Sequence, residues 1–284
     1  MGIKTIGIIG AGIMGNGIAQ VCAAAGYQTI MQDVADAALE RGIKTINASL
    51  ERGVRKGTMT EAEQAALVAR IRTTTKAEDL ADADLVIEAA TENESLKVKI
   101  LQNLDRILRP GAIIATNTSS ISITRLAAAT GRPERFVGMH FFNPVPVMAL
   151  VEVISGLQTS EQTAQEVAEL ARSLGKTAIG VKNSAGFAVN RILCPMLNEA
   201  IFTLQEGIAS AEEIDAGMKL GCNHPIGPLA LCDMVGLDTL LAVMNVLYTT
   251  FNDPKYRPAT LLQEMVDAGM YGRKSGRGFY SYAK

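Results

Sequence analysis

The 284-residue sequence has few of the side chains that hold metal ions. It contains two histidines and four cysteines, and the cysteines show neither CxxC pairing nor a ligand spacing with the histidines. We therefore expect no metal site, and we interpret the cysteines as the reduced thiols of a cytosolic protein.

The sequence also lacks an excess of positive charge and any long apolar run. With 27 Lys and Arg against 29 Asp and Glu, the formal net charge is −2, which gives no general attraction to nucleic acid or to an anionic membrane. No apolar run reaches the ~18 residues of a membrane span, and no basic-then-apolar leader precedes the first strand pattern. These absences favour a cytoplasmic protein without membrane or nucleic-acid partners, whose anionic ligands are held by local groups.

Strand and helix patterns alternate in the first part of the chain. From Lys4 to Val181 short apolar runs alternate with amphipathic helical stretches, whereas the pattern from Phe187 onward is helical only. The sequence therefore predicts an α/β fold, with a Rossmann-like, doubly wound and mostly parallel sheet over residues 1–184. An all-α domain is expected over residues 185–284.

A glycine motif follows the first strand pattern. The apolar run from Lys4 ends in Gly10-Ala11-Gly12-Ile13-Met14-Gly15, and Asn16 to Ala25 has a helical pattern. In a dinucleotide-binding unit the first glycine makes the tight turn, the second lets backbone amides approach a pyrophosphate, and the third lets the helix pack against the strand. The motif predicts such a site, with the amides at the helix start, Ile13 and Met14 included, near the phosphates.

Asp33 ends the second strand pattern, which runs from Gln28 to Gln32. An acidic side chain ~20 residues beyond the glycine motif meets the adenosine ribose hydroxyls. The next residues, Val34 and Ala35, offer no arginine for a 2′-phosphate, so NAD is favoured over NADP.

A basic helical segment is inserted after this strand. Asp36 to Leu50 continues as a helix, and Arg52, Arg55 and Lys56 precede a second helical stretch that we expect to reach Arg72. Such a cluster is usually a solvated charged face, and a functional role is the alternative that these residues alone leave open.

Polar residues follow the next two strand patterns, residues 84–89 and 112–116, which we interpret as the third and fourth strands. They are Thr91-Glu92-Asn93 and Asn117-Thr118-Ser119-Ser120. Open α/β sheets bind their ligands at this carboxyl edge. Ser120 or Ser122 also fits a helix cap, which is compatible with Asn117 and Ser119 facing a ligand.

A hairpin with a histidine and a carboxylate comes next. Two apolar strand patterns, Phe136 to Phe142 and Met148 to Ile154, flank a run of turn formers, and a turn centred on Pro146 pairs position 140 with position 152. His140 and Glu152 would then be cross-strand neighbours with Cβ atoms roughly 4.5–5.5 Å apart. This is the geometry of a general base with its orienting carboxylate, and equally that of a buried pair that only holds the hairpin.

The helical part of the chain offers fewer candidates. Asn190 lies near the start of its first helix, close to the domain junction, where substrate sites are common. His224, between an asparagine and a proline, is interpreted as a loop histidine with a structural hydrogen bond. The basic tail, Tyr271 to Tyr280, can fold back on a ligand or lie on the surface.

Together these motifs resemble those of the short-chain L-3-hydroxyacyl-CoA dehydrogenases, with the bacterial 3-hydroxybutyryl-CoA dehydrogenases as the closest kind. The resemblance extends from Ile6 to Phe279 and is carried by the glycine loop, Glu92 with Lys97, Asn117-Thr118-Ser119-Ser120, His140-Phe141-Phe142-Asn143-Pro144, Glu152 and Gly186-Phe187-Ala188-Val189-Asn190-Arg191. It implies an NAD-binding Rossmann domain over residues 1–184, and a helical substrate and dimerisation domain over residues 185–284 that forms a homodimer. It also implies NAD-dependent interconversion of (S)-3-hydroxybutyryl-CoA and acetoacetyl-CoA, as in fatty acid or butanoate metabolism, by hydride transfer with a His-Glu acid/base pair.

The resemblance assigns roles residue by residue. It implies a catalytic set of His140, Glu152, Ser119 and Asn190, in which Ser119 and Asn190 also bind the substrate. It implies CoA contacts from Ser49, Arg52 and Lys56. It implies cofactor contacts from Gly10, Gly12, Ile13, Met14, Gly15, Asp33, Glu92, Lys97, Asn117, Asn143 and Lys274. One departure is that the family often has lysine where Arg52 stands, which keeps the charge but changes the hydrogen-bond geometry.

Two other classes of protein share parts of this pattern. An oxidoreductase of the 3-hydroxyisobutyrate or 6-phosphogluconate type would carry a lysine base in a GxGxxxK stretch, which is not evident in this sequence. A non-catalytic NAD-binding protein, as some crystallin relatives of the family resemble, would not need the His140, Glu152, Ser119 and Asn190 set. The intact set favours an enzyme.

Overall fold

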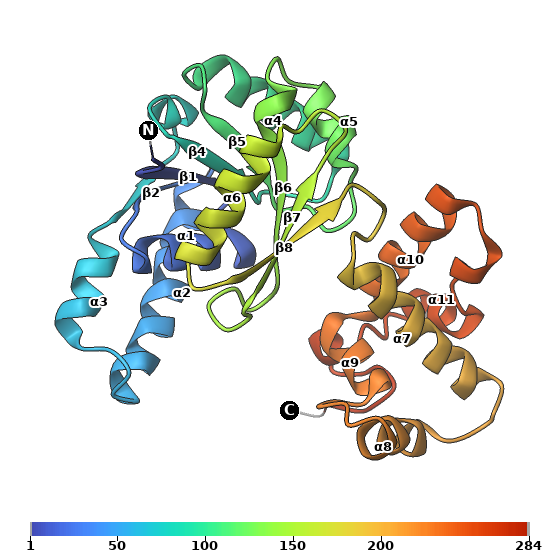
Figure 1. Cartoon of the computed structure of the whole chain (residues 1–284). Helices are drawn as coiled ribbons and strands as arrows, with labels where there is room; N and C mark the ends of the chain where they lie inside the picture. The colour runs from blue at the N-terminus through green and yellow to red at the C-terminus, as the bar shows by residue number, and fades with distance from the viewer. Residues whose placement is uncertain (1, 283–284) are drawn as a thin grey trace. The chain divides into compact units, whose positions relative to one another are not determined.

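The computed structural model describes residues 2–282 and consists of two compact units that meet between Ser184 and Ala185. The first unit is built on a sheet and the second is helical (Figure 1). Each unit has its own hydrophobic core, so each is described separately.

The first unit is organised by an eight-stranded sheet in the order β3-β2-β1-β4-β5-β6-β7-β8. The strands are β1 (Thr5–Ile9), β2 (Gln28–Gln32), β3 (Ile71–Thr74), β4 (Leu85–Glu88), β5 (Ile113–Thr116), β6 (Phe136–Phe141), β7 (Leu150–Ser155) and β8 (Thr177–Lys182). Strands β1 to β6 are mutually parallel, β7 is antiparallel to β6, and β8 is parallel to β7. The expected mostly parallel sheet is confirmed, and its strand order reverses direction between β1 and β4, where open α/β sheets bind ligands.

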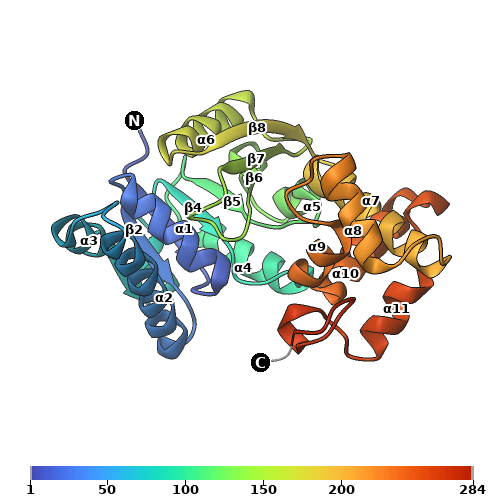
Figure 2. The ribbon, with the colours of Figure 1, turned by 90° about the horizontal axis from the view of Figure 1, so that it is seen from below.

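Helices cover both faces of this sheet (Figure 2). They are α1 (Ile13–Ala24), α2 (Asp36–Arg55), α3 (Glu61–Val68), α4 (Glu94–Ile107), α5 (Ile123–Ala128) and α6 (Glu161–Ser173), with short 3-10 turns at Ala77–Leu80 and Pro133–Arg135. One core joins alternate strand residues such as Ile8 and Met139 to Ile18 of α1, Ile46 of α2 and Val167 of α6. On the opposite face a Cβ atom at Gly138 of β6 would lie 2.8 Å from Ile123 of α5, so the strands are packed on both sides.

The expected second helix of the inserted pair was too long. Helix α3 ends at Val68 instead of reaching Arg72, and β3 follows it as an edge strand, so that Leu85–Glu88 is the fourth strand and Ile113–Thr116 the fifth. The pattern gave no strand signal because β3 pairs only with β2, and Arg72 and Thr73 within it are exposed. The start of α3 follows local rules, since Thr60 and Glu63 form a reciprocal capping box.

Over residues 185–282 the second unit is built from helices, as expected, and apart from two isolated β-bridges near its end it has no strand. The helices are α7 (Val189–Gln205), α8 (Ala211–Gly221), α9 (Pro228–Val235), α10 (Leu237–Phe251) and α11 (Thr260–Asp267), with 3-10 turns at Pro254–Tyr256 and Arg273–Ser275. Their core gathers residues such as Leu197, Ile201, Leu240 and Met244. Within residues 2–282 no single helix is long and apolar enough to span a membrane. Helices α9 and α10 together have the length and composition of a span, but the chain bends by 97° between them.

The basic tail is bound to the helical unit. Asp233, which is 1% exposed, accepts hydrogen bonds from the backbone amides of Phe279 at 3.0 Å and Tyr280 at 2.9 Å, and from the hydroxyl of Tyr282 at 3.0 Å. A buried carboxylate therefore holds the tail against its own unit.

Candidate active site

The glycine motif at the end of β1 contains two glycines that the fold itself requires. Gly10 has φ +95°, and a Cβ atom there would lie 2.7 Å from Cα of Ala90. A Cβ atom on Gly15 would lie 1.7 Å from the carbonyl oxygen of Gly10. Gly12 is different, because a Cβ atom there would meet no protein atom within 4 Å. A ligand can therefore approach the backbone closely at Gly12.

The start of α1 fits a dinucleotide. Gly12 is the N-cap of this helix and provides no side-chain cap, so the amides of its first turn point into the space beside Gly12. Asp33 lies against the same loop, because its carboxylate accepts from the amides of Ala11 at 2.8 Å and Ala35 at 3.3 Å. The adjacent Val34 is 90% exposed and carries no charge, so the residue after Asp33 provides no cation for a 2′-phosphate.

The histidine and glutamate of the hairpin pair as expected. In the register of β6 and β7, His140 is opposite Glu152, and His140 Nδ1 lies 2.7 Å from Glu152 Oε2. His140 is 6% exposed and Glu152 is 0% exposed. Because an ionised carboxylate only accepts, Nδ1 is the donor in this hydrogen bond, which fixes the tautomer and the ring orientation.

Polar residues at the ends of β4 and β5 form a hydrogen-bonded cluster at the same edge of the sheet. Glu92 Oε1 accepts from the Thr118 hydroxyl at 2.7 Å, from the Ser119 amide at 2.9 Å and hydroxyl at 3.1 Å, and from the Ser120 hydroxyl at 3.2 Å. The parallel neighbours β1, β4, β5 and β6 therefore bring the glycine loop, Glu92, Ser119 and His140 to one edge.

Asn117 connects this cluster to the histidine strand. Its Oδ1 accepts from the amide of Phe141 at 2.8 Å, so it fixes the end of β5 against the residue that follows His140. Asn143, which is exposed, begins the connection from β6 to β7. Of the two serines that could cap α5, Ser120 and Ser122, the cap is Ser122, whose side chain accepts from the amide of Arg125.

The expected CoA contacts lie on α2. Ser49, Arg52 and Lys56 follow one another at helical spacing, so they share a face at the C-terminal end of the helix. Ser49 accepts from Gln20 Nε2 at 3.3 Å, while Arg52 and Lys56 are exposed.

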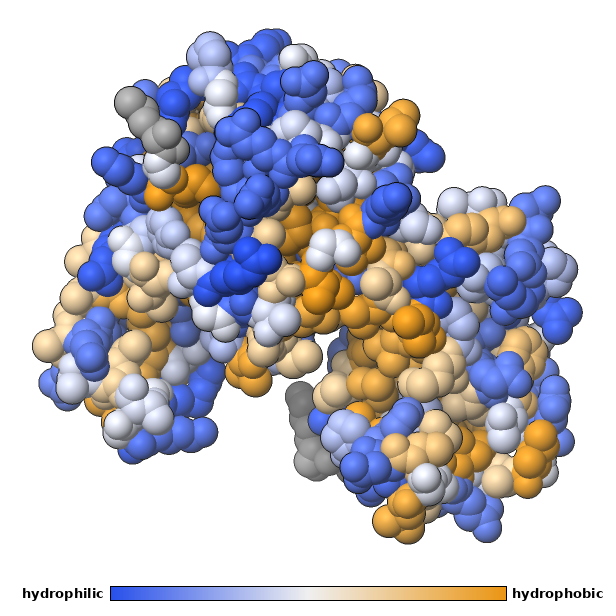
Figure 3. Space-filling model, in the orientation of Figure 1, coloured by the Kyte–Doolittle hydropathy of each residue, from blue (hydrophilic) through white to orange (hydrophobic). Residues whose placement is uncertain are grey.

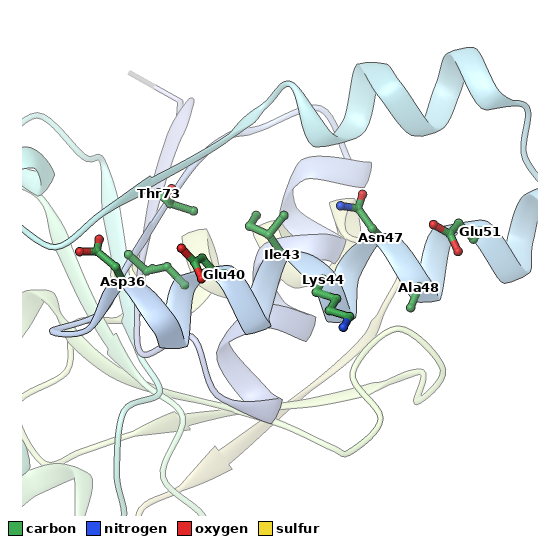
Figure 4. Close-up of a pocket in the computed structure, with 9 residues that line it drawn as sticks. Asp36, Glu40, Ile43, Lys44, Asn47, Ala48, Glu51 and Thr73 are labelled. Carbon is green, nitrogen blue, oxygen red and sulfur yellow. The ribbon is translucent and has the colours of Figure 1, made fainter.

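A surface hollow elsewhere on α2 contains none of the predicted site residues. It is lined by Asp36, Leu39, Glu40, Ile43, Lys44, Asn47, Ala48, Glu51 and Thr73. Three of these residues are acidic and one is basic (Figure 4), a lining that does not favour an anionic ligand.

Two predicted site residues belong to the helical unit. Asn190 lies in the first turn of α7 and is partly buried. Lys274 is exposed, and its ammonium group forms an ion pair with Asp238 at 2.5 Å.

Comparison with known proteins decides the family. The family model described as 3-hydroxyacyl-CoA dehydrogenase, NAD binding domain, matches residues 5–184, and the model of the 3-hydroxyacyl-CoA dehydrogenase C-terminal domain matches residues 186–282. The chain belongs to the 3-hydroxyacyl-CoA dehydrogenase family. It is an NAD-dependent oxidoreductase, and the resemblance found in its sequence is confirmed.

Members of the 3-hydroxyacyl-CoA dehydrogenase family match this chain over its full length. A 3-hydroxybutyryl-CoA dehydrogenase of Bradyrhizobium diazoefficiens is 53% identical over 280 residues, which cover 99% of this chain and 96% of the relative. A probable 3-hydroxybutyryl-CoA dehydrogenase of Bacillus subtilis is 52% identical over 282 residues, covering 99% and 98%. The crystal structure of an (S)-3-hydroxybutyryl-CoA dehydrogenase from Ralstonia eutropha shares 63% identity, covers 99% of this chain and 100% of its own, and has a TM-score of 0.97.

The site of this 3-hydroxyacyl-CoA dehydrogenase contains one residue that sequence reasoning missed. Glu88, at the end of β4, is 0% exposed and accepts from Lys97 Nζ at 2.6 Å and from the Thr116 hydroxyl at 2.8 Å. Lys97 is itself 1% exposed and lies 3.9 Å from Glu92, so its charge is shared by two carboxylates. A glutamate inside an otherwise apolar strand was the signal that could have found it.

Proposed function

We propose that this protein interconverts (S)-3-hydroxybutyryl-CoA and acetoacetyl-CoA. The observation that carries the proposal is the buried His140–Glu152 pair, with a 2.7 Å contact, at the same sheet edge as the glycine motif. The choice of a four-carbon substrate is supported by full-length relatives whose names specify 3-hydroxybutyryl-CoA.

His140 is the proton acceptor in this mechanism. Because Nδ1–H is donated to Glu152, proton transfer with the substrate uses Nε2, which takes the proton of the 3-hydroxyl group. Bound NAD supplies the acceptor for the hydride that leaves C3. Glu152 stabilises the imidazolium ion, which returns the proton to the substrate oxygen in the reverse direction.

Ser119 and Asn190 hold the reacting oxygen. A hydroxyl group has one proton, and that of Ser119 is donated to Glu92 at 3.1 Å. When the hydroxyl group rotates to donate to the substrate oxygen instead, the backbone amide of Ser119 still donates to Glu92 at 2.9 Å, so the loop keeps its position. Asn190 is the second residue proposed to contact the substrate oxygen.

The cofactor-binding residues divide into three groups. Gly10 and Gly15 shape the glycine loop, the amides at the start of α1, those of Ile13 and Met14 included, face the pyrophosphate beside Gly12, and Asp33 faces the adenosine ribose. Lys97 contributes through its charge, because Glu88 holds its ammonium group inside the unit. Further cofactor contacts come from Glu92, Asn117, Asn143 and Lys274.

Ser49, Arg52 and Lys56 bind the phosphates of CoA. A protein with a formal net charge of −2 must meet these phosphates with local cations, and Arg52 and Lys56 are exposed on one face of α2.

The helical unit also forms a homodimer. Large apolar side chains on its surface include Ile192, which is 72% exposed, and Leu220, which is 87% exposed. Figure 3 shows apolar surface over α7 and α8. Such surface supports a protein partner, and a second copy of this chain is the proposed one. A cytoplasmic location is supported by the four free cysteines.

Replacing the histidine tests the proposal. With acetoacetyl-CoA and NADH, we expect His140→Ala to lower kcat by about 10²- to 10⁴-fold, because general acid–base catalysis is lost. The matched control is His224→Ala, which removes the other histidine and should leave kcat unchanged. A near-normal kcat for His140→Ala would remove this residue from the mechanism.

The wild-type protein tests the substrate. We expect kcat/KM to be highest for acetoacetyl-CoA in a series of 3-ketoacyl-CoAs of increasing length, and higher with NADH than with NADPH. A higher kcat/KM for long-chain 3-ketoacyl-CoAs would exclude the four-carbon compound as the preferred substrate. Failure to oxidise NADH with any 3-ketoacyl-CoA would instead favour a non-catalytic NAD-binding protein.

A further inference from the structure

Lys176, immediately before β8, is a buried cation that the proposed mechanism does not use. It is 8% exposed, and its ammonium group donates to the backbone carbonyls of Val145 at 2.6 Å and Met148 at 2.8 Å. Within residues 2–282 no carboxylate forms an ion pair with it at 4 Å or less. Burial lowers the pKa of this lysine, so its position has an energetic cost that the two carbonyl contacts offset only in part.

Both carbonyls belong to the segment that connects the two strands of the proton-transfer pair. This segment, residues 142–149, leaves β6 after His140 and enters β7 before Glu152. Most of its residues are exposed, and Val145 is the buried exception at 2% exposure. Its own turn is closed by the Pro144 carbonyl, which accepts from the amides of Val147 and Met148 at 2.9 Å.

Side chains attach the connecting segment at two points outside its own turn. One is the side chain of Val145, which packs so closely on α1 that a Cβ atom at Gly17 would lie 2.9 Å from the Val145 Cβ. The other is Lys176, whose two hydrogen bonds fix the backbone on either side of Pro146. The amide of Thr177 also donates to the Ala149 carbonyl at 2.7 Å, so β8 and the segment form one unit.

These attachments connect the proton-transfer hairpin to the cofactor loop. Helix α1, on which Val145 rests, begins at the glycine motif, and Asn143 lies two residues before Val145 in the exposed part of the segment. The position of Asn143 relative to the start of α1 therefore depends on how firmly residues 145–148 are held. A nonpolar side chain at position 176 could fill the same space, but it could not satisfy the buried carbonyl of Val145 or the partly buried carbonyl of Met148.

We propose that Lys176 is a positioning residue for cofactor binding, acting through the connecting segment on Asn143. The proposal rests on the proposed function, in which Asn143 contacts NAD. His140 and Glu152 are held by the strand register of β6 and β7 instead. Loss of Lys176 should therefore weaken the cofactor complex and leave proton transfer nearly intact.

The test compares Lys176→Met with Lys182→Met, a change of an exposed lysine at the other end of β8. In Lys176→Met we expect the Kd and the KM for NADH to rise about 5- to 20-fold. The kcat should stay within about twofold of wild type, and the KM for acetoacetyl-CoA should not change. Lys182→Met should match the wild type in every constant. A lower melting temperature with an unchanged Kd for NADH would mean that Lys176 is only structural, and would overturn the proposal.

A double-mutant cycle tests whether the effect passes through Asn143. In an Asn143→Ala background, the added Lys176→Met change should alter the Kd for NADH by less than about twofold, since coupled residues are not additive. Full additivity would overturn the proposed route. If Lys176→Met does not fold, Lys176→Gln, which keeps an uncharged NH2 donor group, replaces it. Binding of NADH is read by its fluorescence without turnover, so this test is separate from a failure of the proposed activity.

Discussion

At the scale of single residues, the chemistry depends on a carboxylate that is completely buried. Glu152 is 0% exposed and lies 2.7 Å from the ring of His140. Little solvent screens this pair, so the ionised carboxylate stabilises an imidazolium ion more strongly than an exposed carboxylate would. The charge of Glu152 is therefore expected to contribute more to catalysis than its shape.

Glu152→Gln removes that charge and keeps the shape. A hydrogen bond to a charged group is worth about 1.5–3 kcal/mol, so we expect kcat to fall roughly 10- to 100-fold. The Kd for NADH, measured by fluorescence, should stay at its wild-type value. Glu169→Gln, on the exposed side of α6, is the control and should change neither constant. Loss of NADH affinity in Glu152→Gln would point to a structural role.

The sequence predicted this pair more fully than it predicted the surroundings of Lys97. In an antiparallel hairpin the residue numbers of facing positions add up to the same value, so the position of the turn was enough to pair His140 with Glu152. The structure confirms this register. The contact of Lys97 with Glu88 depends on how α4 packs against the end of β4, which no local pattern encodes. Lys176 escaped notice for the same reason, because its partners are backbone carbonyls about 30 residues earlier in the chain.

At the scale of secondary structure, long amphipathic helices and buried strands were predictable, and the edge strand β3 was not. Helix α2 has one buried face and strand β4 begins with a continuous apolar run, and these patterns located them. In β3 only Ile71 is apolar, so its strand character comes from pairing with β2. Such a strand is specified by the sheet that receives it, and its own residues carry little information.

The face of α2 that carries Ser49, Arg52 and Lys56 gives a prediction for this element. Lys56→Ala should raise the KM for acetoacetyl-CoA about two- to fivefold, as expected for an exposed charge pair, with no change in the KM for NADH. Added salt should reduce the difference from wild type, because it screens exposed charges. Lys44→Ala, on a different face of α2, is the control. An unaltered KM in Lys56→Ala would mean that the cluster is solvated surface.

The junction of β1 and β4 gives a prediction for pH dependence. Asp84 accepts from the amides of Lys4 at 2.7 Å and Thr5 at 2.8 Å, and it pairs with Arg109. Burial alone would raise the pKa of this carboxyl group. The hydrogen bonds from the two amides and from Arg109 together lower it by more, so the pKa lies below the ordinary value of 3.8. A folded-state pKa below the unfolded one stabilises the fold above about pH 4, and this contribution is lost as the pH falls through the folded-state pKa.

We therefore expect Asp84→Asn to lower the free energy of unfolding by about 1–3 kcal/mol at pH 7, measured by urea denaturation. The gap to wild type should narrow as the pH falls below about 4, because the wild-type carboxylate is then protonated as well. Asp82→Asn, at a nearby exposed position, should cost little at either pH. An equal gap at pH 7 and at low pH would contradict this account.

At the scale of the whole molecule, the two units differ in how their surfaces are covered. Each has a separate core, one between sheet and helices and one among helices. Within residues 2–184 the sheet unit exposes six large apolar residues, Ile13, Val34, Leu96, Val147, Met148 and Leu157, spread over nearly twice the chain length of the helical unit. The smaller helical unit has Ile192, Ile208, Leu220, Met234, Val235 and Tyr248 at its surface. This density of exposed apolar groups is the physical reason to expect a partner on the helical unit.

That reasoning leads to a prediction of the oligomeric state. In analytical ultracentrifugation at micromolar concentration, the wild type should have twice the 30.1 kDa mass of one chain. A double change of Ile192→Lys and Leu220→Lys should shift it toward 30.1 kDa, because two desolvated charges would then be buried at the interface. Leu157→Lys, which alters a side chain 86% exposed on the sheet unit, should leave the dimer intact. A monomeric wild type would contradict the proposed dimer, and dissociation by Leu157→Lys alone would place the interface on the sheet unit. Circular dichroism of each variant distinguishes dissociation from unfolding.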